Sequence, residues 1–296
     1  MESALHLHRM KTPRFVICLL LASLASIAQD AASKDDRGSI SASPEPVSYV
    51  PEGYRISWQD EFDGEALDRK NWGFPSYKQR GAAELNTPGT TRLSDGMLYL
   101  TTLWKDEKVH ASYITTHGRF TQRYGYFESR LRFHKHQGHH GAFWVQTASF
   151  KGAVDKPNES GTEIDIIEWF GSGRRRGWAG MNIYYWGTLP NGEAGKIRSP
   201  SIPAFPKMGG PLESHPTSPM GDLSDDFRVY GMLWTPEKVV IYCDGVEIMR
   251  DTEAVSQIPQ HVVLSLLCAE WERPRLDTAK LPDGMQVDYV RVYTKE

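Results

Sequence analysis

The chain reads Glu163-Ile164-Asp165-Ile166-Ile167-Glu168 near its middle, so three carboxylates lie within six residues. The isoleucines between them are β-branched and predict a strand. On a regular strand, Glu163 and Asp165 share one face, and Glu168 points to the other. A β-bulge at Ile166-Ile167 would add one residue and return Glu168 to the face of the other two acids. Because crowding carboxylates is costly, the stretch predicts a functional surface rather than an edge strand with its acids in water.

Short apolar or alternating segments, separated by turn residues, continue on both sides of this stretch from residue 51 to residue 296. The clearest local pattern is a hairpin that pairs residues 238–242 with 246–249 around Asp244-Gly245. Turns are also predicted at Ser94-Asp95-Gly96 and at Pro282-Asp283-Gly284. The periodicity indicates no long helix. Residues 51–296 are therefore predicted to form a single all-β domain, a sandwich or a barrel.

The N-terminal segment has the layout of a secretory signal peptide. Arg9, Lys11 and Arg14 precede an apolar run that ends at Ala28 in a small-residue cleavage pattern. This run is shorter than the roughly twenty residues that a membrane-spanning helix needs. We therefore expect residues 1–28 to be removed, with an uncleaved N-terminal anchor as the alternative. Residues 29–50 are rich in Ser, Ala, Asp and Pro without periodicity, which predicts a disordered tether.

The net charge of the full chain is −3, and this mild acidity argues against nucleic acid or an anionic membrane as a partner. We expect a secreted or periplasmic protein that is monomeric and leaves the membrane once the signal is removed. Besides Cys18 in the signal, the chain has Cys243 and Cys268. These two thiols would form one disulfide in an oxidising compartment or remain free and buried, and the sequence leaves both possibilities open.

Paired carboxylates on a rigid scaffold are the groups that glycoside hydrolysis uses. One attacks the anomeric carbon, and the other, protonated, gives a proton to the leaving oxygen. A third acid nearby raises the proton affinity of its neighbours by like-charge repulsion. The chain also carries nine Trp and thirteen Tyr residues, and aromatic rings are suitable surfaces for the C–H faces of sugars. Several surround the acids, although a single Trp more often belongs to a hydrophobic core.

Four further segments give the chain a recognisable resemblance. Tyr124-Gly-Tyr-Phe-Glu-Ser-Arg130 and Gly141-Ala-Phe-Trp-Val-Gln146 precede the acid motif, and the likeness extends from Trp58-Gln-Asp-Glu-Phe-Asp63 to Val287-Asp-Tyr-Val-Arg-Val-Tyr293. With these flanks, the chain resembles family 16 of the glycoside hydrolases, which includes laminarinases, lichenases, agarases, porphyranases and carrageenases. The spacing Glu-x-Asp-x-x-Glu is the bulged version found in the laminarinase-like and algal-galactan members.

The resemblance implies a β-jelly-roll sandwich of two antiparallel sheets, with a concave substrate cleft and a retaining double displacement that needs no cofactor. By position, Glu163 matches the nucleophile, Glu168 the general acid/base and Asp165 the supporting acid. Trp144 matches the aromatic residue beside the sugar at the cleavage point. The other side chains that we expect to contact the polysaccharide are Trp169, Tyr184, Trp186, His139, His140 and Trp271.

Two departures from the laminarinase pattern bear on the substrate. Tyr184 stands where laminarinases commonly have His, and His139-His140 replace a common Trp-Pro. His139 and His140 are expected to face the substrate, with a simple exposed loop as the alternative. Arg174-Arg175-Arg176 would either contact an acidic polysaccharide or form a solvated turn. The resemblance also implies a structural calcium ion held by Glu61, the Gly96 carbonyl and Asp288, although the two acids could be ordinary surface residues.

The sequence therefore predicts a secreted endo-β-glycanase that acts with retention on a β-1,3-glucan or a related polysaccharide. The alternatives among enzymes are a β-galactanase of the agarase or porphyranase type and a transglycosylase. From another class, a carbohydrate-binding protein without catalysis could use the same sandwich. The presence of both Glu163 and Glu168 favours an enzyme over this binding protein.

Overall fold

The computed structural model describes residues 48–75, 83–156, 159–174, 179–198, 222–252 and 255–296. The predicted signal peptide, nearly all of the predicted tether, and Arg175 and Arg176 lie outside these residues. No helix in the described part of the chain is both long and apolar enough to cross a membrane.

Strands make up most of the described structure, and the two helices are short 3-10 turns. The elements are β1 (Tyr54–Asp60), β2 (Ala83–Leu85), β3 (Thr91–Ser94), β4 (Met97–Lys105), β5 (Lys108–Thr115), β6 (Gly125–Arg132), β7 (His140–Thr147), β8 (Gly161–Trp169), β9 (Ala179–Thr188), β10 (Ala194–Arg198), β11 (Arg228–Trp234), β12 (Val239–Cys243), β13 (Val246–Asp251), β14 (Gln260–Leu267), η2 (Arg273–Arg275), η3 (Thr278–Lys280) and β15 (Asp283–Lys295).

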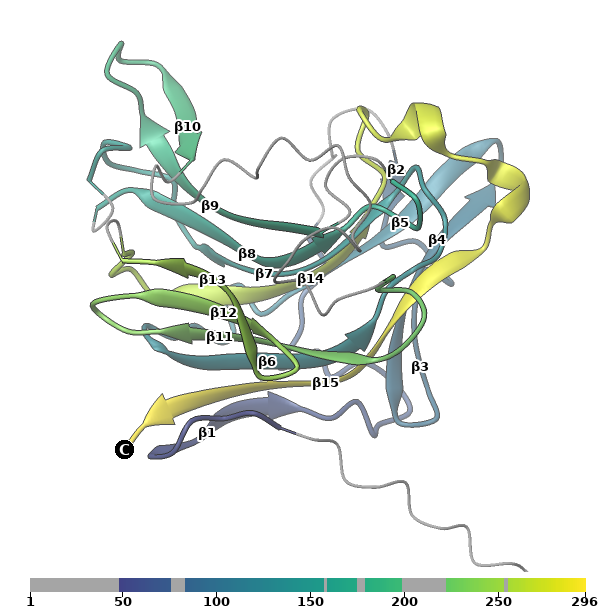
Figure 1. Cartoon of the computed structure of the whole chain (residues 1–296). Helices are drawn as coiled ribbons and strands as arrows, with labels where there is room; N and C mark the ends of the chain where they lie inside the picture. The colour runs from purple at the N-terminus through teal and green to yellow at the C-terminus, as the bar shows by residue number, and fades with distance from the viewer. Residues whose placement is uncertain (1–47, 76–82, 157–158, 175–178, 199–221, 253–254) are drawn as a thin grey trace, which may run out of the picture. The chain divides into compact units, whose positions relative to one another are not determined.

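These strands form two stacked layers (Figure 1). One layer has the order β10-β9-β8-β7-β14-β5, and the other has the order β4-β15-β6-β11-β12-β13, with β1 added beside β15. The pairing of β4 with β5 joins the layers, so a single hydrogen-bonded ladder folds over on itself. Neighbouring strands are antiparallel except for β2 and β5. The predicted all-β sandwich of two sheets is therefore confirmed.

The main hydrophobic core fills the space between the two layers. The acid-bearing strand β8 contributes Ile164, Ile166 and Ile167, all of which are fully buried. The second layer contributes residues such as Met232 and Val290 to the same cluster. Burial of such side chains is the main favourable term in folding, at about 25 cal/mol per Å² of apolar surface. The isoleucines of the motif thus anchor β8 to the core and leave its other face for the acids.

The predicted turns are confirmed in two of three cases. Asp244 and Gly245 have positive φ values of 48° and 76°, and they connect β12 to β13 in a tight hairpin. Asp95 and Gly96 do the same between β3 and β4, with φ values of 55° and 68°. The turn predicted at Pro282-Asp283-Gly284 is wrong, because β15 begins at Asp283. The Asp283 carboxylate accepts hydrogen bonds from the backbone N–H groups of Lys135 and His136, in the connection between β6 and β7. Its side chain therefore has a structural role.

Cys243 and Cys268 are both free and buried. Cys243 belongs to the main core, and the Cys268 thiol lies 3.2 Å from the Gly138 carbonyl oxygen. Burial raises the pKa of both thiols, to about 12 and about 11, so they stay protonated and unreactive near neutral pH. Of the two possibilities that the sequence left open, the structure shows free thiols.

Candidate active site

The acid motif contains the predicted bulge. On one side of β8, Asp165 pairs with Trp144 of β7 and Ile167 pairs with Phe143, so Ile166 has no partner of its own. On the other side, the register with β9 also shifts between Asp165 and Glu168. This unpaired residue turns Glu168 to the same face as Glu163 and Asp165.

All three acids line one pocket of about 240 Å³ on the outer face of this layer. Its remaining walls come from β7, which pairs with β8, and from β14, which pairs with the other edge of β7. The residues that line it with the acids are His140, Ala142, Trp144, Gln146, Ser265 and Leu267. The Trp144 indole is held by a hydrogen bond from Nε1 to Ser265 Oγ at 3.1 Å and by an edge contact with Tyr113. Trp144 therefore lies beside the acids as predicted.

Glu163 has the most hydrogen-bond donors of the three acids. Gln146 Nε2 donates to its Oε2 at 3.2 Å, and Trp186 Nε1 donates to the same oxygen at 3.1 Å. Burial raises the pKa of Glu163. The Lys196 ammonium and these two donors offset part of that rise. Glu163 is therefore the acid whose ionised form the surroundings support best.

Glu168 and Asp165 hold their protons more tightly. Burial, followed by the negative charge of Glu163, raises the pKa of Glu168 to about 7. Burial, followed by repulsion from Glu168 and Glu163, raises the pKa of Asp165 well above its usual range. Asn182 opposes both shifts and donates to Glu168 Oε2 at 3.3 Å. Environments that push neighbouring carboxyl groups apart in proton affinity are typical of acid/base pairs in enzymes.

Three aromatic side chains form a wall beside the pocket. The rings of His140 and Phe170 stack with centroids 5.4 Å apart, and the Trp271 ring lies 5.4 Å from His140 and 5.5 Å from Phe170. Trp271 is 56% exposed, whereas the other two rings are buried. Burial lowers the pKa of His140 to about 4, so this ring is neutral near pH 7. The wall offers an apolar surface with one neutral polar edge to a sugar.

The loop that carries Trp271 is fixed by a buried ion pair. Arg174 Nε donates to Glu272 at 3.1 Å, and the Glu272 side chain is fully buried. Arg174 is thus neither a solvated residue nor a substrate contact, in contrast to both alternatives for the arginine run. It instead connects the segment after β8 to the segment after β14.

Tyr184 and Trp186 lie on the same face as the acids. In the register of β8 with β9, Tyr184 is opposite Glu163, and Trp186 is opposite Gly161. Both side chains are half-buried. They extend the surface from the acids toward β10, and their contact with a substrate stays a prediction.

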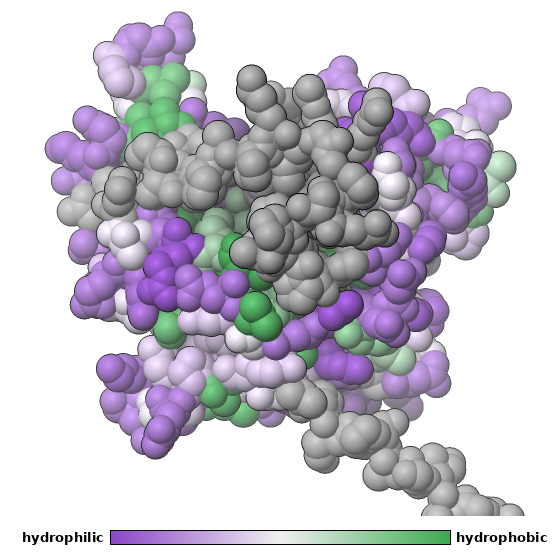
Figure 2. Space-filling view, viewed as in Figure 1, coloured by the Kyte–Doolittle hydropathy of each residue, from purple (hydrophilic) through white to green (hydrophobic). Residues whose placement is uncertain are grey.

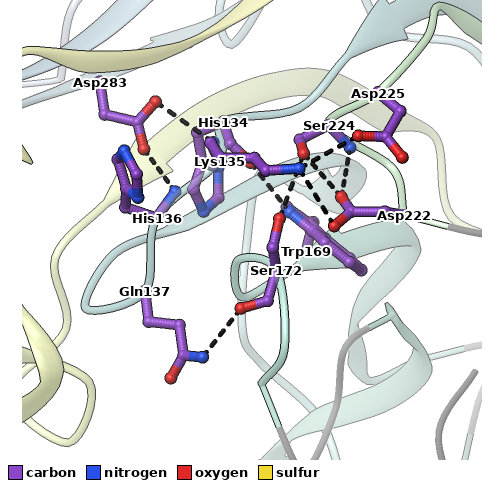
Figure 3. A network of polar contacts seen from close by, with 10 residues as sticks. All are labelled: His134, Lys135, His136, Gln137, Trp169, Ser172, Asp222, Ser224, Asp225 and Asp283. Atoms are coloured by element: carbon purple, nitrogen blue, oxygen red, sulfur yellow. Dashed lines mark hydrogen bonds and ion pairs between the residues drawn. The ribbon is translucent and has the colours of Figure 1, made fainter.

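Trp169 and His139 do not face the cleft, and their predicted substrate contacts are wrong. Trp169 is fully buried in the core, and its Nε1 donates to the His134 carbonyl oxygen at 3.0 Å (Figure 3). Because Glu168 faces the pocket, the next residue along the strand must point inward. The same alternation turns His139 away, since His140 faces the pocket. His139 is fully buried, with Nε2 3.1 Å from Asp283.

Around these two residues a polar network holds the ends of several strands together (Figure 3). Asp283 accepts the His136 backbone N–H at 2.7 Å, and the Lys135 ammonium contacts Asp222 and Asp225 at 3.4 and 3.0 Å. Ser172 donates its backbone N–H to the Lys135 carbonyl oxygen at 2.9 Å. The histidines that precede β7 therefore have a structural role. Across the described residues, no three His, Cys, Asp or Glu side chains come together as metal ligands.

The residues expected to hold calcium do not fit that ion as they lie here. Glu61 makes two hydrogen bonds to Arg291, each 2.7 Å long, and Asp288 is 2.7 Å from Arg130. Each carboxylate is already neutralised by a guanidinium group, which would have to leave before a cation could bind. The chemistry of the three acids requires no calcium ion.

Four polar residues of the site were missed by the sequence reasoning. Gln146 lies two positions after Trp144, and Asn182 lies two positions before Tyr184, so strand alternation could have identified both. Lys196 is opposite Trp186 in the β9–β10 hairpin, which was not predicted. Ser265 comes from β14, and only the pairing of strands distant in sequence brings it to the acids.

Comparison with known proteins agrees with this geometry. A family model described as the GH16 domain of beta-porphyranases A–D matches residues 56–295. The chain belongs to glycoside hydrolase family 16. In this family, the endo-1,3-1,4-beta-glycanase EglC of Rhizobium meliloti is 26% identical over 212 residues, which are 68% of this chain and 39% of that protein.

A second relative, the keratan-sulfate endo-1,4-beta-galactosidase of Sphingobacterium multivorum, is 24% identical over 81% of this chain and 55% of its own length. The chain thus spans less than two thirds of both relatives. Among solved structures, the kappa-carrageenase of Zobellia galactanivorans superposes with a TM-score of 0.63 at 22% identity, covering 82% of this chain and 96% of that one. This likeness confirms the predicted jelly-roll sandwich.

Deleting Ile166 tests the bulge. The deletion leaves Glu163, Asp165 and Glu168 at alternate positions, so regular alternation alone would place all three on one face. We expect the register shift to disappear and the domain to stay folded with Glu168 at the pocket, while the loss of a buried isoleucine costs about 2–5 kcal/mol. The matched substitution Ile166→Val keeps the bulge and should cost only about 1 kcal/mol. Melting curves of the two variants make the comparison. Complete unfolding of the deletion variant would show that the bulge is needed for more than the direction in which Glu168 faces.

Glu168→Gln tests the crowding of the acids. Because folding raises the pKa of Glu168, its contribution to stability is complete at low pH and is lost as pH rises through about 7. The neutral variant escapes this loss, so it should melt higher than the parent by about 2 °C or more at about pH 8, with a smaller difference at about pH 5. Glu237→Gln, on an exposed turn, serves as the control. A difference that is the same at both pH values would contradict the expected strain.

Proposed function

We propose that the chain is a secreted, retaining endo-β-galactanase that hydrolyses a β-linked galactan of the porphyran class. The observation that carries the proposal is the bulged strand, which brings Glu163 and Glu168 to one pocket in environments that give them different proton affinities. The other parts of the proposal are residues 1–28 as a cleaved signal peptide and a monomeric mature protein.

Glu163 acts as the nucleophile in this mechanism. Its carboxylate attacks the anomeric carbon and forms a glycosyl ester, while the glycosidic bond to the leaving sugar breaks. Gln146 and Trp186 both hydrogen-bond to Oε2, which leaves Oε1 without a described donor and suited to the attack. The same two bonds fix the orientation of the carboxylate.

Glu168 acts as the general acid and then as the general base. It transfers its proton to the leaving oxygen in the first step, and in the second step it takes a proton from the water that attacks the anomeric carbon. A pKa of about 7 allows both roles near neutral pH. The ester to Glu163 breaks in the second step, so the product keeps the β configuration.

Asp165 supports the pair without reacting. It lies between the two glutamates on the strand and is buried, so it remains protonated while one neighbour is ionised. A neutral Asp165 limits the negative charge in the pocket and can donate a hydrogen bond. This role follows from its position and its raised pKa.

For the substrate, the sequence alone ranked β-1,3-glucan first, and the comparisons favour a galactan. The matching family model is that of porphyranases, and one relative is a β-galactosidase that acts on keratan sulfate. The replacement of the common laminarinase residues by Tyr184 and His139-His140 is in line with this preference. A β-1,3(4)-glucanase remains the second candidate, because EglC is a glycanase of 1,3-1,4 linkages.

Assays across porphyran, agarose, carrageenan, laminarin and lichenan test the function. We expect new reducing ends from porphyran or agarose, formed first as the β anomer in proton NMR spectra. Glu163→Gln should lower the rate by about 10³-fold or more, because a neutral amide cannot form the ester. The control Glu237→Gln should keep full activity. Products from laminarin or lichenan alone would identify a glucanase, and binding without any products would identify a carbohydrate-binding protein.

Trp271 tests the aromatic wall. Replacing the exposed indole by alanine should raise KM by about 10-fold and change kcat little, since one stacked aromatic ring contributes about 1 kcal/mol or more to sugar binding. Trp271→Tyr retains a stacking ring and should stay within about threefold of the parent. Steady-state kinetics on the galactan makes the measurement. If both variants behave like the parent, the wall does not contact the substrate.

A further inference from the structure

The hairpin of β9 and β10 lies at the edge of the layer that carries the pocket (Figure 1). Lys196 of β10 is directly opposite Trp186 of β9, so the two side chains share a face. Figure 2 shows an apolar area on this hairpin, and Leu189 and Ile197 pack against the main core. The hairpin is therefore anchored, and its polar face borders the cleft.

Lys196 lies over two aromatic rings. Its ammonium nitrogen is 3.8 Å from the centroid of Tyr184 and 4.6 Å from the ring of Trp186. The exposed Phe150 ring lies 5.6 Å from Trp186 and extends the same surface outward. We call these four residues, Phe150, Tyr184, Trp186 and Lys196, the β10 platform. It begins at the nucleophile, since Trp186 also donates to Glu163.

The charge of Lys196 is available to a ligand. Its side chain is exposed, and its ammonium group lies against the rings of Tyr184 and Trp186. Cation–π contacts at exposed sites are weak, and they leave the positive charge of the ammonium in place. The rings therefore place the ammonium without neutralising it.

Lys196 also lies close to the three acids of the pocket. A pocket with clustered carboxylates repels an anionic polysaccharide, because like charges raise the energy of the complex. Lys196 is close enough to lower the pKa of Glu163, Asp165 and Glu168. A cation at this edge offsets the repulsion at the point where the chain of sugars leaves the acids.

We propose that the β10 platform binds a sulfate ester carried by a sugar next to the one held at Glu163. The Lys196 ammonium contacts the sulfate oxygens, and the Tyr184 and Trp186 rings beneath it hold the ammonium in position. Lys196 is then a specificity residue that selects sulfated over neutral galactan. This inference rests on the proposed galactanase function.

Kinetics on matched substrates tests the proposal. Porphyran and the same porphyran after chemical desulfation are compared with the parent, Lys196→Met and Lys196→Arg. We expect Lys196→Met, which keeps the carbon chain and loses the charge, to lower kcat/KM on the sulfated form by about tenfold, mostly through KM. Because Lys196 also lowers the pKa of the three acids, activity on the desulfated form should fall too, but by a smaller factor than on the sulfated form, and Lys196→Arg should resemble the parent. Lys295→Met, an exposed lysine at the end of β15, is the control.

A different result would overturn it. If Lys196→Met loses activity equally on both substrates and its pH profile shifts, Lys196 acts on the carboxylates and not on a sulfate. Affinity electrophoresis of Glu163→Gln, with and without Lys196→Met, tests the site without turnover. A preference for the sulfated polymer that disappears with Lys196→Met supports the proposal, and equal retention by both polymers refutes it. Failure of the proposed function is a separate result, seen as no products from either galactan.

Discussion

A single unpaired residue in β8 determines what faces the cleft and what faces the core. Strands β7 and β9 pair with β8 on both sides of the bulge, and both registers shift at the same place. Upstream of it, Glu163 and Asp165 face the pocket, and downstream of it Glu168 does so as well. The same shift sends Trp169 inward, where its indole binds the His134 carbonyl and fixes the loop before β7. One extra residue thus decides which side chains of β8 line the pocket and which pack in the core.

The bulge brings three carboxyl groups into one partly desolvated pocket. Neighbouring hydrogen-bond donors stabilise the ionised form of these groups to different extents. The pKa values of all three acids are raised, but Gln146 and Trp186 offset part of the rise for Glu163, whereas like-charge repulsion adds to the rise for Glu168 and Asp165. The separation of roles therefore comes from unequal compensation by neighbours on β7 and β9. Active sites commonly give up stability in this way to gain reactivity.

Local sequence patterns predicted the strands, two of the tight turns and the bulge, because each depends on neighbouring residues. Predictions of the cleft contacts were less successful. Trp169 and His139 were assigned to the cleft because of their residue types, although alternation next to Glu168 and His140 turns them away. Ser265 and the pairing of Arg174 with Glu272 depend on which distant strands and loops become neighbours. No local pattern encodes that choice, since it follows from the packing of the whole sandwich.

The order of strands in the sheet also governs when the site can form. Trp144 of β7 reaches its partner Ser265 on β14, 121 residues away, and Ser129 of β6 binds the Tyr289 carbonyl oxygen of β15, 160 residues away. Domains dominated by such non-local pairings fold slowly, because the entropy of long loops must be lost before the contacts form. During synthesis, the acid-bearing strand emerges well before the two strands that complete its layer and its core. The pocket lined by the three acids is thus among the last features that a newly made chain can acquire. Until then, the unpaired strands of the chain are open to aggregation.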